Sequence, residues 1–502
     1  MQSEKQSKTD QVIKPQTAEG ISLEAIEQCN MIDPKIHKKA MLKLDTVVLG
    51  CFGIMYLLAN LDRNNLGNTN IMGLPKDLNL KGNEFGNAVT LFFATYVAFE
   101  APCSIALKVV GPKNLLSFCM LGWGVVCLGM GFIKNANQLY ACRLLIGFFE
   151  AGLIPCINAY IGMVYLRSEM SLRSAIMYGF SAFAGAVGGL LASAVSNIHA
   201  GGLPSWSWLF IIEGLLTIVL VPVIYAVFPK DPRTAWFLNE EERRVISLRF
   251  ELNPHLSMNE AFSWPKILSA FKDPKMYLHS ILEFSVSLSL FSFMTFLPAI
   301  IRGLGYTSVH AQLLTVPVYL WATVSYVIIA LLSDRVGLRA PFILGACLFL
   351  IIGYSINLGT EALGARYAAV FIIGCGVYAT AGLSIVWLNS NFAGHYKRAT
   401  ALGVTFSVGN SSGIVVGQIF TAQTAPRYVR GTGITMGFAG FAMLLVCVNA
   451  LALHYVNKQR VERLAAREPS TGREQGEKDE SRMWDLTRMN LINWRANSQS
   501  LI

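Results

Sequence analysis

The sequence predicts an all-α polytopic membrane protein with twelve transmembrane helices in two six-helix bundles. The chain has 502 residues, of which 53% are hydrophobic and only 14% are charged, whereas a soluble chain carries about 25% charged residues. Its mean hydropathy is +0.46. Twelve spans of about 22 residues would use roughly half of the chain. This composition argues against a secreted enzyme, a nucleic-acid-binding protein and a disordered scaffold.

Twelve apolar segments recur along the chain, separated by short polar turns and by one longer loop. We place these segments at 47–72, 85–107, 114–133, 138–165, 174–198, 207–228, 276–301, 311–332, 341–358, 367–388, 401–421 and 432–456. The expected organisation is a tail (1–45), a first bundle (46–229), a central loop (230–275), a second bundle (276–456) and a second tail (457–502).

The central loop contains the run Asn239-Glu-Glu-Glu-Arg-Arg-Val-Ile. An asparagine followed by acidic residues is typical of a helix N-terminus. We expect a short amphipathic helix that acts as a cytoplasmic strut, with a regulatory module as the alternative.

The positive charges set the expected orientation. Most of the 41 Lys and Arg residues fall in the segments that lie inside if the N-terminus is cytoplasmic, as the positive-inside rule requires. The segments expected on the outer side hold seven Lys and Arg residues: Lys76, Lys81, Lys134, Arg302, Arg366, Arg427 and Arg430. Both termini are therefore expected in the cytoplasm, with the protein in the plasma membrane. The polar N-terminal tail has no apolar run typical of a signal peptide.

The ten cysteines show no CxxC or Cys/His ligand spacing, and nine lie in or beside apolar runs, where a thiol behaves as a small hydrophobe. No nucleophile–base pair is evident. We expect no disulfide framework, no metal, no cofactor and no enzymatic activity.

An internal repeat relates the two halves at an offset of 225–226 residues. Val110-Gly-Pro-Lys113 matches Val336-Gly-Leu-Arg339, and Arg173 matches Arg398. Both pairs fall in loops after the second and fourth helix of each half. Two similar bundles facing each other are typical of a transporter with its substrate site between them.

Charged residues within a span are costly and are functional candidates by default. The run Val47–Leu61 is too short to cross the bilayer, so the first helix must continue through Asp62 and Arg63. Arg63 offers a planar fork that suits a substrate carboxylate, and Asp62 could take up a proton. The alternatives are a structural ion pair or snorkelling to the interface.

Arg143, Gly147 and Glu150 share one face of the fourth helix. Gly147 leaves room for a neighbour, and a buried Glu150 near a cation could load and release a proton. The alternative is a structural ion pair between the fourth and first helices.

Other polar residues within spans are weaker candidates. Structural roles are favoured for Glu100, Glu213 and Glu283. Asn410 on the eleventh helix is either an interhelical hydrogen-bonding residue or a ligand contact. Further lining candidates are Trp387, Asn389, Asn391, Ser411 and Ser412. The glycines Gly185, Gly188 and Gly189 predict close helix packing.

Several ordered motifs resemble the major facilitator superfamily, specifically the fungal allantoate permease branch of the anion:cation symporters, over about 43–456. The motifs are Lys43-Leu-Asp45, Leu61-Asp-Arg-Asn-Asn-Leu-Gly-Asn68, Arg143-Leu-Leu-Ile-Gly-Phe-Phe-Glu-Ala151, Trp208-Leu-Phe-Ile-Ile-Glu-Gly214, Asn391-Phe-Ala-Gly-His-Tyr-Lys-Arg398, Gly409-Asn410 and Ala425-Pro-Arg-Tyr428.

The resemblance implies proton-coupled uptake of small organic anions by alternating access. It assigns the anion contact to Arg63, proton handling to Asp62 and Glu150, and a place in the substrate cavity to Asn410. We assign Arg143 to proton coupling, and Trp387 and Asn391 to substrate binding. Family substrates include nicotinate, allantoate, pantothenate, biotin and small peptides. We favour a nicotinate-like heteroaromatic acid.

Two positions depart from the family pattern: Ser207 stands where relatives usually carry arginine, and Asn60 where they often carry an aromatic or larger apolar residue. The expected partners are a small organic anion, protons and the lipid bilayer, without nucleic acid, and the expected state is a monomer. An exporter of a carboxylated metabolite and a non-transporting nutrient sensor remain as alternatives.

Overall fold

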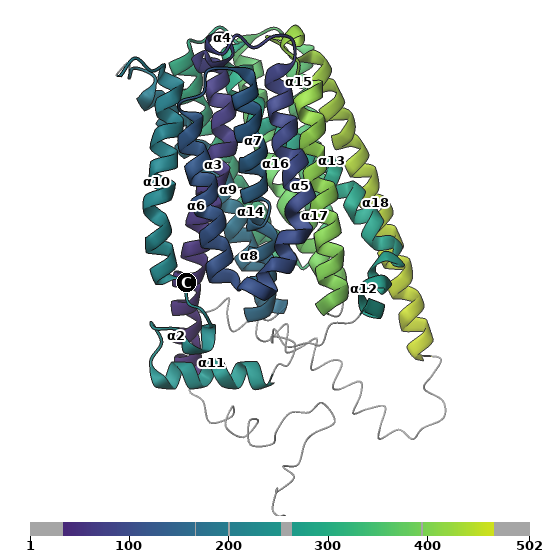
Figure 1. Ribbon diagram of the computed structural model, residues 1–502. Coiled ribbons are helices and arrows are strands. Elements are labelled where there is room, and N and C mark those ends of the chain that lie inside the picture. The colour runs from purple at the N-terminus through teal and green to yellow at the C-terminus, as the bar shows by residue number, and fades with distance from the viewer. Residues whose placement is uncertain (1–33, 166, 199–200, 253–263, 393–394, 466–502) are drawn as a thin grey trace, which may run out of the picture.

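The computed structural model describes residues 34–165, 167–198, 201–252, 264–392 and 395–465. Nearly all of them are helical (Figure 1). The first half contains α2 (Pro34–Leu44), the π-helical turn η1 (Asp45–Leu49), α3 (Gly50–Met72), α4 (Leu74–Asp77), α5 (Glu84–Val110), α6 (Pro112–Met130), α7 (Ala136–Glu150), α8 (Leu153–Val164), α9 (Arg167–Val195) and α10 (Ser205–Val227). The connection contains η2 (Pro232–Thr234), α11 (Glu240–Leu252) and α12 (Trp264–Phe271). The second half contains α13 (Pro274–Arg302), α14 (Ser308–Val336), α15 (Ala340–Gly359), α16 (Leu363–Asn391), α17 (His395–Ile419), η4 (Ala422–Thr424) and α18 (Val429–Ala465).

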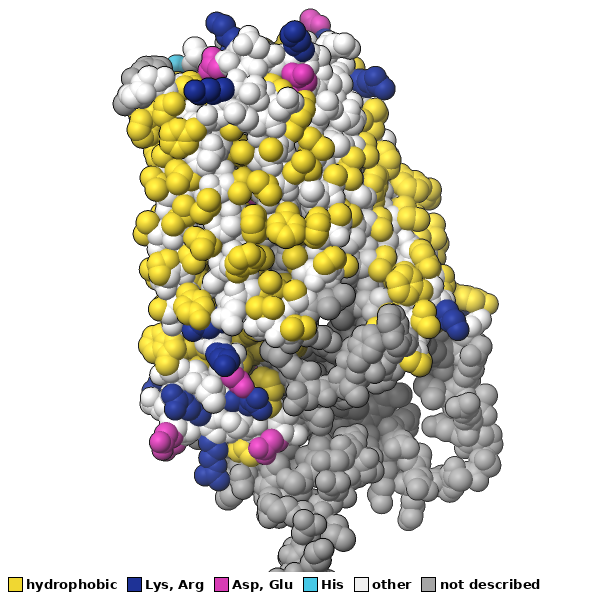
Figure 2. Space-filling model, in the orientation of Figure 1, with side chains coloured by type: hydrophobic (Ala, Val, Ile, Leu, Met, Phe, Trp, Pro, Cys, Tyr) yellow, Lys and Arg dark blue, Asp and Glu magenta, His cyan; other side chains and the backbone are white. Residues whose placement is uncertain are grey.

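Within the described part of the chain, ten helical segments are long and apolar enough to cross a membrane. Helices α5 and α17, of 27 and 25 residues, also have the length of membrane spans and complete the expected twelve. A broad band of hydrophobic side chains covers the middle of the molecule, with charged side chains at its two ends (Figure 2). The prediction of an all-α polytopic protein is therefore confirmed.

The helices form two bundles, and three helix pairs make the most extensive contacts between them. In the first half, α3 packs on α9 and α10, and α5, α6 and α7 pack on one another. In the second half, α15 packs on α16 and α18, and α13 on α17 and α18. Helices α5, α9 and α3 pack on α17, α14 and α13 of the other half, respectively. We call the first of these contacts the α5–α17 seam.

Local sequence explains where several spans begin and end. Asn135 caps α7 by accepting from the Gln138 amide at 3.0 Å, and Thr307 likewise caps α14. Gly73 ends α3 in the left-handed conformation, with φ of 108°, which costs glycine little. These caps satisfy backbone groups that helix ends leave unpaired.

The helix predicted in the central loop is confirmed as α11. Glu242 accepts from the Asn239 backbone N–H at 2.9 Å, so the acidic first turn closes the N-terminus of the helix. Two other boundaries differ from expectation. Helix α2 begins at Pro34, within the expected polar tail, and α18 continues to Ala465. The rest of that second tail, residues 466–502, lies outside the described residues.

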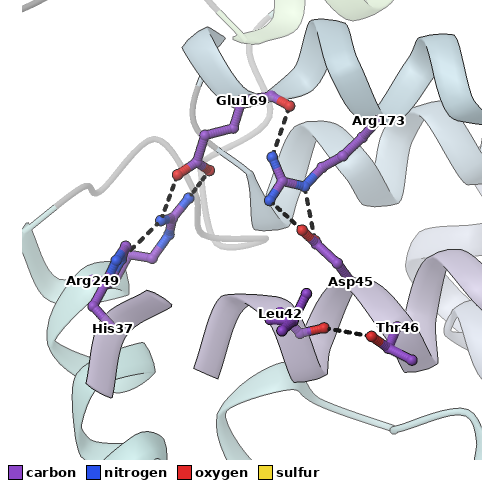
Figure 3. Close-up of polar contacts among 7 residues, drawn as sticks. All are labelled: His37, Leu42, Asp45, Thr46, Glu169, Arg173 and Arg249. Atoms are coloured by element: carbon purple, nitrogen blue, oxygen red, sulfur yellow. Dashed lines mark hydrogen bonds and ion pairs between the residues drawn. The ribbon is translucent and has the colours of Figure 1, made fainter. Parts of the chain in front are cut away.

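A ring of ion pairs joins α2, α9 and α11 at the end of the first bundle. Lys43 of α2 pairs with Glu242 of α11 at 2.7 Å. Figure 3 shows the other two sides of the ring: Arg249 of α11 pairs with Glu169 of α9, and Arg173 of α9 pairs with Asp45 at 2.6 Å. We call these six residues the ion-pair ring. Because every pair joins a different pair of helical segments, the ring fixes α11 to the first bundle.

Candidate functional site

An ion pair between the first and fourth spans forms the centre of the candidate site. Arg63 of α3 donates from Nε to Oε2 of Glu150 at the end of α7, at 2.8 Å. Glu150 is fully buried and Arg63 is 7% exposed. Nη2 of Arg63 and Oε1 of Glu150 have no hydrogen-bond partner among the described residues. Each group therefore retains capacity for one more polar contact.

Arg143 lies two turns before Glu150 on the same buried face of α7. Its guanidinium stacks on the Phe92 ring at 4.5 Å and donates to the Ala88 carbonyl oxygen at 3.4 Å. No carboxylate of the described residues lies at ion-pair distance from it. A Cβ on Gly147 would lie 2.3 Å from the Phe92 carbonyl oxygen, so this glycine lets α5 approach α7.

The two arginines line one small pocket between the bundles. The first bundle contributes Arg63, Leu66, Val89, Phe92, Phe93 and Arg143, and α13 contributes Phe291, Met294 and Thr295. The Arg63 guanidinium also stacks over Tyr96 at 4.8 Å. The pocket thus combines two cations with aromatic walls, a composition that suits a small anion with a flat apolar body.

Asp62 does not line this pocket, although it is next to Arg63 in sequence. Its Oδ1 accepts from the Cys127 thiol of α6 at 3.0 Å. Glu213 of α10 lies beside it and accepts from Asn65. Asp62, Cys127 and Glu213 each offer a metal-ligand atom within 4.8 Å of the others. One oxygen of each carboxyl group accepts a hydrogen bond inside the first bundle, whereas Asp62 Oδ2 and Glu213 Oε2 have no hydrogen-bond partner among the described residues.

Glu100 and Asn410 meet across the α5–α17 seam. The Asn410 side-chain amide donates to both Glu100 oxygens, at 3.3 and 3.4 Å, and the Ser407 hydroxyl donates at 3.2 Å. Glu283 of α13 instead accepts from Ser287 at 3.2 Å and from Ser384, both within the second bundle.

The remaining predicted lining residues lie elsewhere. Trp387 of α16 packs edge-on against His279 at 5.2 Å, and Asn391, the last residue of that helix, donates to the Trp387 carbonyl oxygen at 2.9 Å. The Ser411 hydroxyl donates to the Val408 carbonyl oxygen of its own helix at 2.6 Å. The structure therefore brings together Arg63, Arg143 and Glu150, and separately Glu100 and Asn410. It does not bring Trp387, Asn389, Asn391, Ser411 or Ser412 into the arginine pocket.

The two departures from the family pattern lie inside the first bundle. Asn60 accepts from the Ser181 hydroxyl at 2.7 Å and joins α3 to α9. Ser207 is buried near the start of α10. The glycine prediction is confirmed for Gly185 and Gly189, where a Cβ would meet Tyr319 at 2.4 Å and Thr315 at 2.5 Å on α14.

Sequence reasoning missed the aromatic and thiol members of the site. Phe92, Tyr96 and Glu100 recur every four residues on α5, a spacing that puts them on one face. That pattern could have identified the two aromatic rings that stack on Arg63. Cys127 gave no signal, because it lies in an ordinary apolar run.

Known proteins of this architecture support the assignment of the chain. The sequence model of the Major Facilitator Superfamily matches residues 52–418. An uncharacterized transporter of Schizosaccharomyces pombe is 39% identical over 86% of this chain and 87% of its own length. A high-affinity nicotinic acid transporter of Saccharomyces cerevisiae is 38% identical over 82% of this chain and 77% of its own length.

Solved structures show the same fold at low sequence identity. A D-xylose-proton symporter superposes with a TM-score of 0.62 at 13% identity, covering 79% of this chain and 96% of its own. A bacterial homologue of the human lysosomal transporter Spinster gives 0.60 at 16% identity, covering 80% and 96%. The chain belongs to the major facilitator superfamily and is a transporter, not an enzyme.

Proposed function

We propose that the protein imports a small organic anion together with protons, and that the anion is a heteroaromatic carboxylate such as nicotinate. The observation that carries this proposal is the pocket between the bundles, which Arg63, Arg143 and three phenylalanine rings line. The similarity to a nicotinic acid transporter supports the same substrate class.

The two arginines suit the carboxylate of such a substrate. Arg63 has an unpaired Nη2, and Arg143 contacts an aromatic ring and a carbonyl oxygen rather than a carboxylate. A buried guanidinium gains most from a charge-assisted, bidentate partner. In this arrangement the pocket has room for about one water molecule, about 10 Å³, so Phe92, Phe93 and Phe291 would enclose the flat ring of the substrate after the bundles separate.

Glu150 links the substrate to a proton in this proposal. It shares Arg63 with the incoming anion, so the substrate carboxylate competes with Glu150 for one guanidinium. A buried carboxylate that loses its cation is strongly destabilised, and Glu150 then takes up a proton. Asp62 handles a second proton inside the first bundle, next to Cys127 and Glu213.

Uptake of labelled nicotinate and of labelled allantoate, in cells that lack their own carriers, tests the proposal. We expect accumulation at pH 5 to exceed accumulation at pH 7.5 and a protonophore to abolish the difference. Acid-stimulated uptake of either compound supports proton-coupled import, and the preferred compound identifies the substrate class. Loss of secretion on gene deletion, without any uptake defect, would instead indicate export.

The location and orientation of the protein belong to the same proposal. We infer a plasma-membrane monomer with both termini in the cytoplasm, so that α2 and α11 lie on the cytoplasmic side. Protease accessibility of an epitope at each terminus, in intact and permeabilised cells, tests the orientation. Cleavage in intact cells would contradict it.

A further inference from the structure

Glu100 differs from the other buried carboxylates of the described membrane helices in where its hydrogen-bond donors lie. The donors to Asp62, Glu150 and Glu213 lie in the first bundle, and those to Glu283 lie in the second, with Glu283 itself. By contrast, Ser407 and Asn410, which donate to Glu100, lie across the seam on the opposite bundle. A movement of one bundle against the other therefore changes the surroundings of Glu100 directly.

The α5–α17 seam runs from the end remote from α11 down to Glu100. Asn83 donates to Gln418 at 2.9 Å and Thr90 donates to the Ile414 carbonyl oxygen at 3.0 Å. Next, Phe93 packs against Gly413. Glu100 follows about 24 Å along α5 from its first residue, at 1.5 Å per residue. Among the described residues, Glu100 makes the α5–α17 hydrogen bonds that lie farthest along α5 from Asn83.

Glu100 is 1% exposed, and both of its donors are neutral. A buried carboxylate with neutral donors only is much less favourable than one in water or beside a cation. The other titratable side chains near Glu100 or its contacts are Arg63, Tyr96, Cys103, Cys119, Glu150 and Cys156. Arg63, the cation among them, is held by Glu150 at 2.8 Å, and the contacts from α17 carry no charge.

Asn410 can accommodate a protonated Glu100 without leaving the seam. Its amide nitrogen is almost equally distant from the two carboxyl oxygens. Turning the amide by 180° presents its oxygen as an acceptor for a carboxylic O–H. The seam can thus close over the neutral acid with its O–H hydrogen-bonded, whereas closing it over the ionised form buries a carboxylate that has only neutral donors.

We propose that Glu100 is a positioning residue that links proton binding to closure of the α5–α17 seam. When the seam is open, water reaches Glu100 and the carboxylate is ionised. A proton binds to it, the neutral side chain docks on Ser407 and Asn410, and the seam closes. This inference rests on the proton coupling of the proposed function, but its conformational step can be measured without transport.

Pulsed electron paramagnetic resonance on the purified full-length protein tests this step. Spin labels at Lys81 and Gln423, which are exposed on opposite sides of the seam, report whether it is open. We expect the short-distance population to grow as the pH is lowered from 8 to 5. Glu100→Gln, which mimics the protonated side chain, should hold that population high at every pH. Glu283→Gln is the matched control and should titrate like the wild type.

Each outcome separates this inference from the proposed function. A Glu100→Gln protein whose distances titrate like the wild type, or a wild type without pH dependence, would overturn the role of Glu100, even if acid-stimulated uptake is present. A pH-dependent seam that requires Glu100, in a protein that does not take up nicotinate or allantoate, would support the inference while rejecting the proposed substrates. Circular dichroism of each variant checks that it is folded.

Discussion

At the scale of single residues, the ion pair between Arg63 and Glu150 has two properties that a purely structural pair would not need. It lies beside a pocket that side chains of both bundles line, and each partner keeps one polar atom without a hydrogen-bond partner among the described residues. Buried ion pairs are weak evidence for stability, because removing two charges from water offsets their attraction. A role in transport explains better why two charges lie there.

Glu150→Gln tests that role. The amide keeps the size of the side chain but cannot release a proton, so acid-driven net uptake should be lost while exchange of labelled for unlabelled substrate continues. Uptake and counterflow in proteoliposomes with an imposed pH gradient measure both. Glu283→Gln is the control, since its carboxyl lies among serines of the other bundle. Normal gradient-driven uptake by Glu150→Gln would rule out Glu150 as the coupling residue.

Arg63→Lys should raise the KM for a carboxylate substrate about tenfold or more, which corresponds to about 1.4 kcal/mol. Lysine keeps the charge but loses the planar fork that suits a carboxylate. Arg143→Lys should raise KM as well, because it lines the same pocket. Initial uptake rates over a substrate series provide the values. An unchanged KM in both variants would place the anion elsewhere.

At the scale of helices, the seams between the bundles depend on close backbone approach. A Cβ on Gly67 of α3 would lie 2.2 Å from the Thr295 carbonyl oxygen of α13. Gly67→Ala should therefore force α3 and α13 apart and shift the protein away from this closed arrangement. Gly129→Ala in α6 is the control, because no atom lies within 4 Å of the added Cβ. We expect the spin labels at Lys81 and Gln423 to show a more open seam in Gly67→Ala than in the wild type, and no such change in Gly129→Ala. Equal distances in both variants would show that the close approach is not limiting.

The ion-pair ring gives a prediction for pH at the level of elements. Burial alone would raise the pKa of Glu242, but the Lys43 ammonium and the Asn239 backbone N–H lower it below its ordinary value of 4.5. A lowered carboxyl pKa stabilises the folded state above the ordinary value and loses that effect as pH falls through the folded pKa. Glu242→Gln should thus lower stability at pH 7 by about 1 kcal/mol, the upper range for partly exposed pairs.

Thermal unfolding of wild type and Glu242→Gln across pH measures this effect. The difference in Tm should be constant near neutrality and close as the pH falls well below 4.5. Glu241→Gln, in the same turn of α11 and exposed, controls for the general loss of a negative charge. A difference in Tm that persists unchanged at pH 3 would contradict an ionic origin.

The same scale shows how far sequence can go. The bilayer fixes the length and polarity of a span, so hydropathy located all twelve helices and the acidic run located α11. The rotation of each helix is set by packing and not by hydropathy. Asp62 and Arg63 are both expected in the site because they lie within one span, whereas Asp62 faces Cys127 inside the bundle and Arg63 faces the pocket. Asn410 could be chosen as polar, but its partner Glu100 lies 310 positions away.

At the scale of the whole molecule, the central connection divides between the bundles. Helix α11 packs on α2 and η2 and is tied to the first bundle by the ion-pair ring. Helix α12 packs on α17 and α13, and Lys397 of α17 pairs with Asp273, before α13, at 2.6 Å. The pairing lowers the pKa of Asp273, although burial opposes it. Each bundle thus carries its own part of the connection.

Alternating access in this fold is largely a rocking of one bundle against the other, so α11 should move with the first bundle as one body. Fluorophores at Glu241 of α11 and Asn114 at the start of α6 should keep the same separation when substrate and protons are added. A pair at Glu241 and Leu338, between α14 and α15, should change its separation under the same conditions. Single-molecule energy transfer on the purified protein measures both pairs. Arg249→Ala, which breaks one side of the ring, should let the first separation vary as well. A first pair that changes with substrate in the intact protein would show that α11 is not fixed to the first bundle, because the rigid body predicted from the ring would not exist.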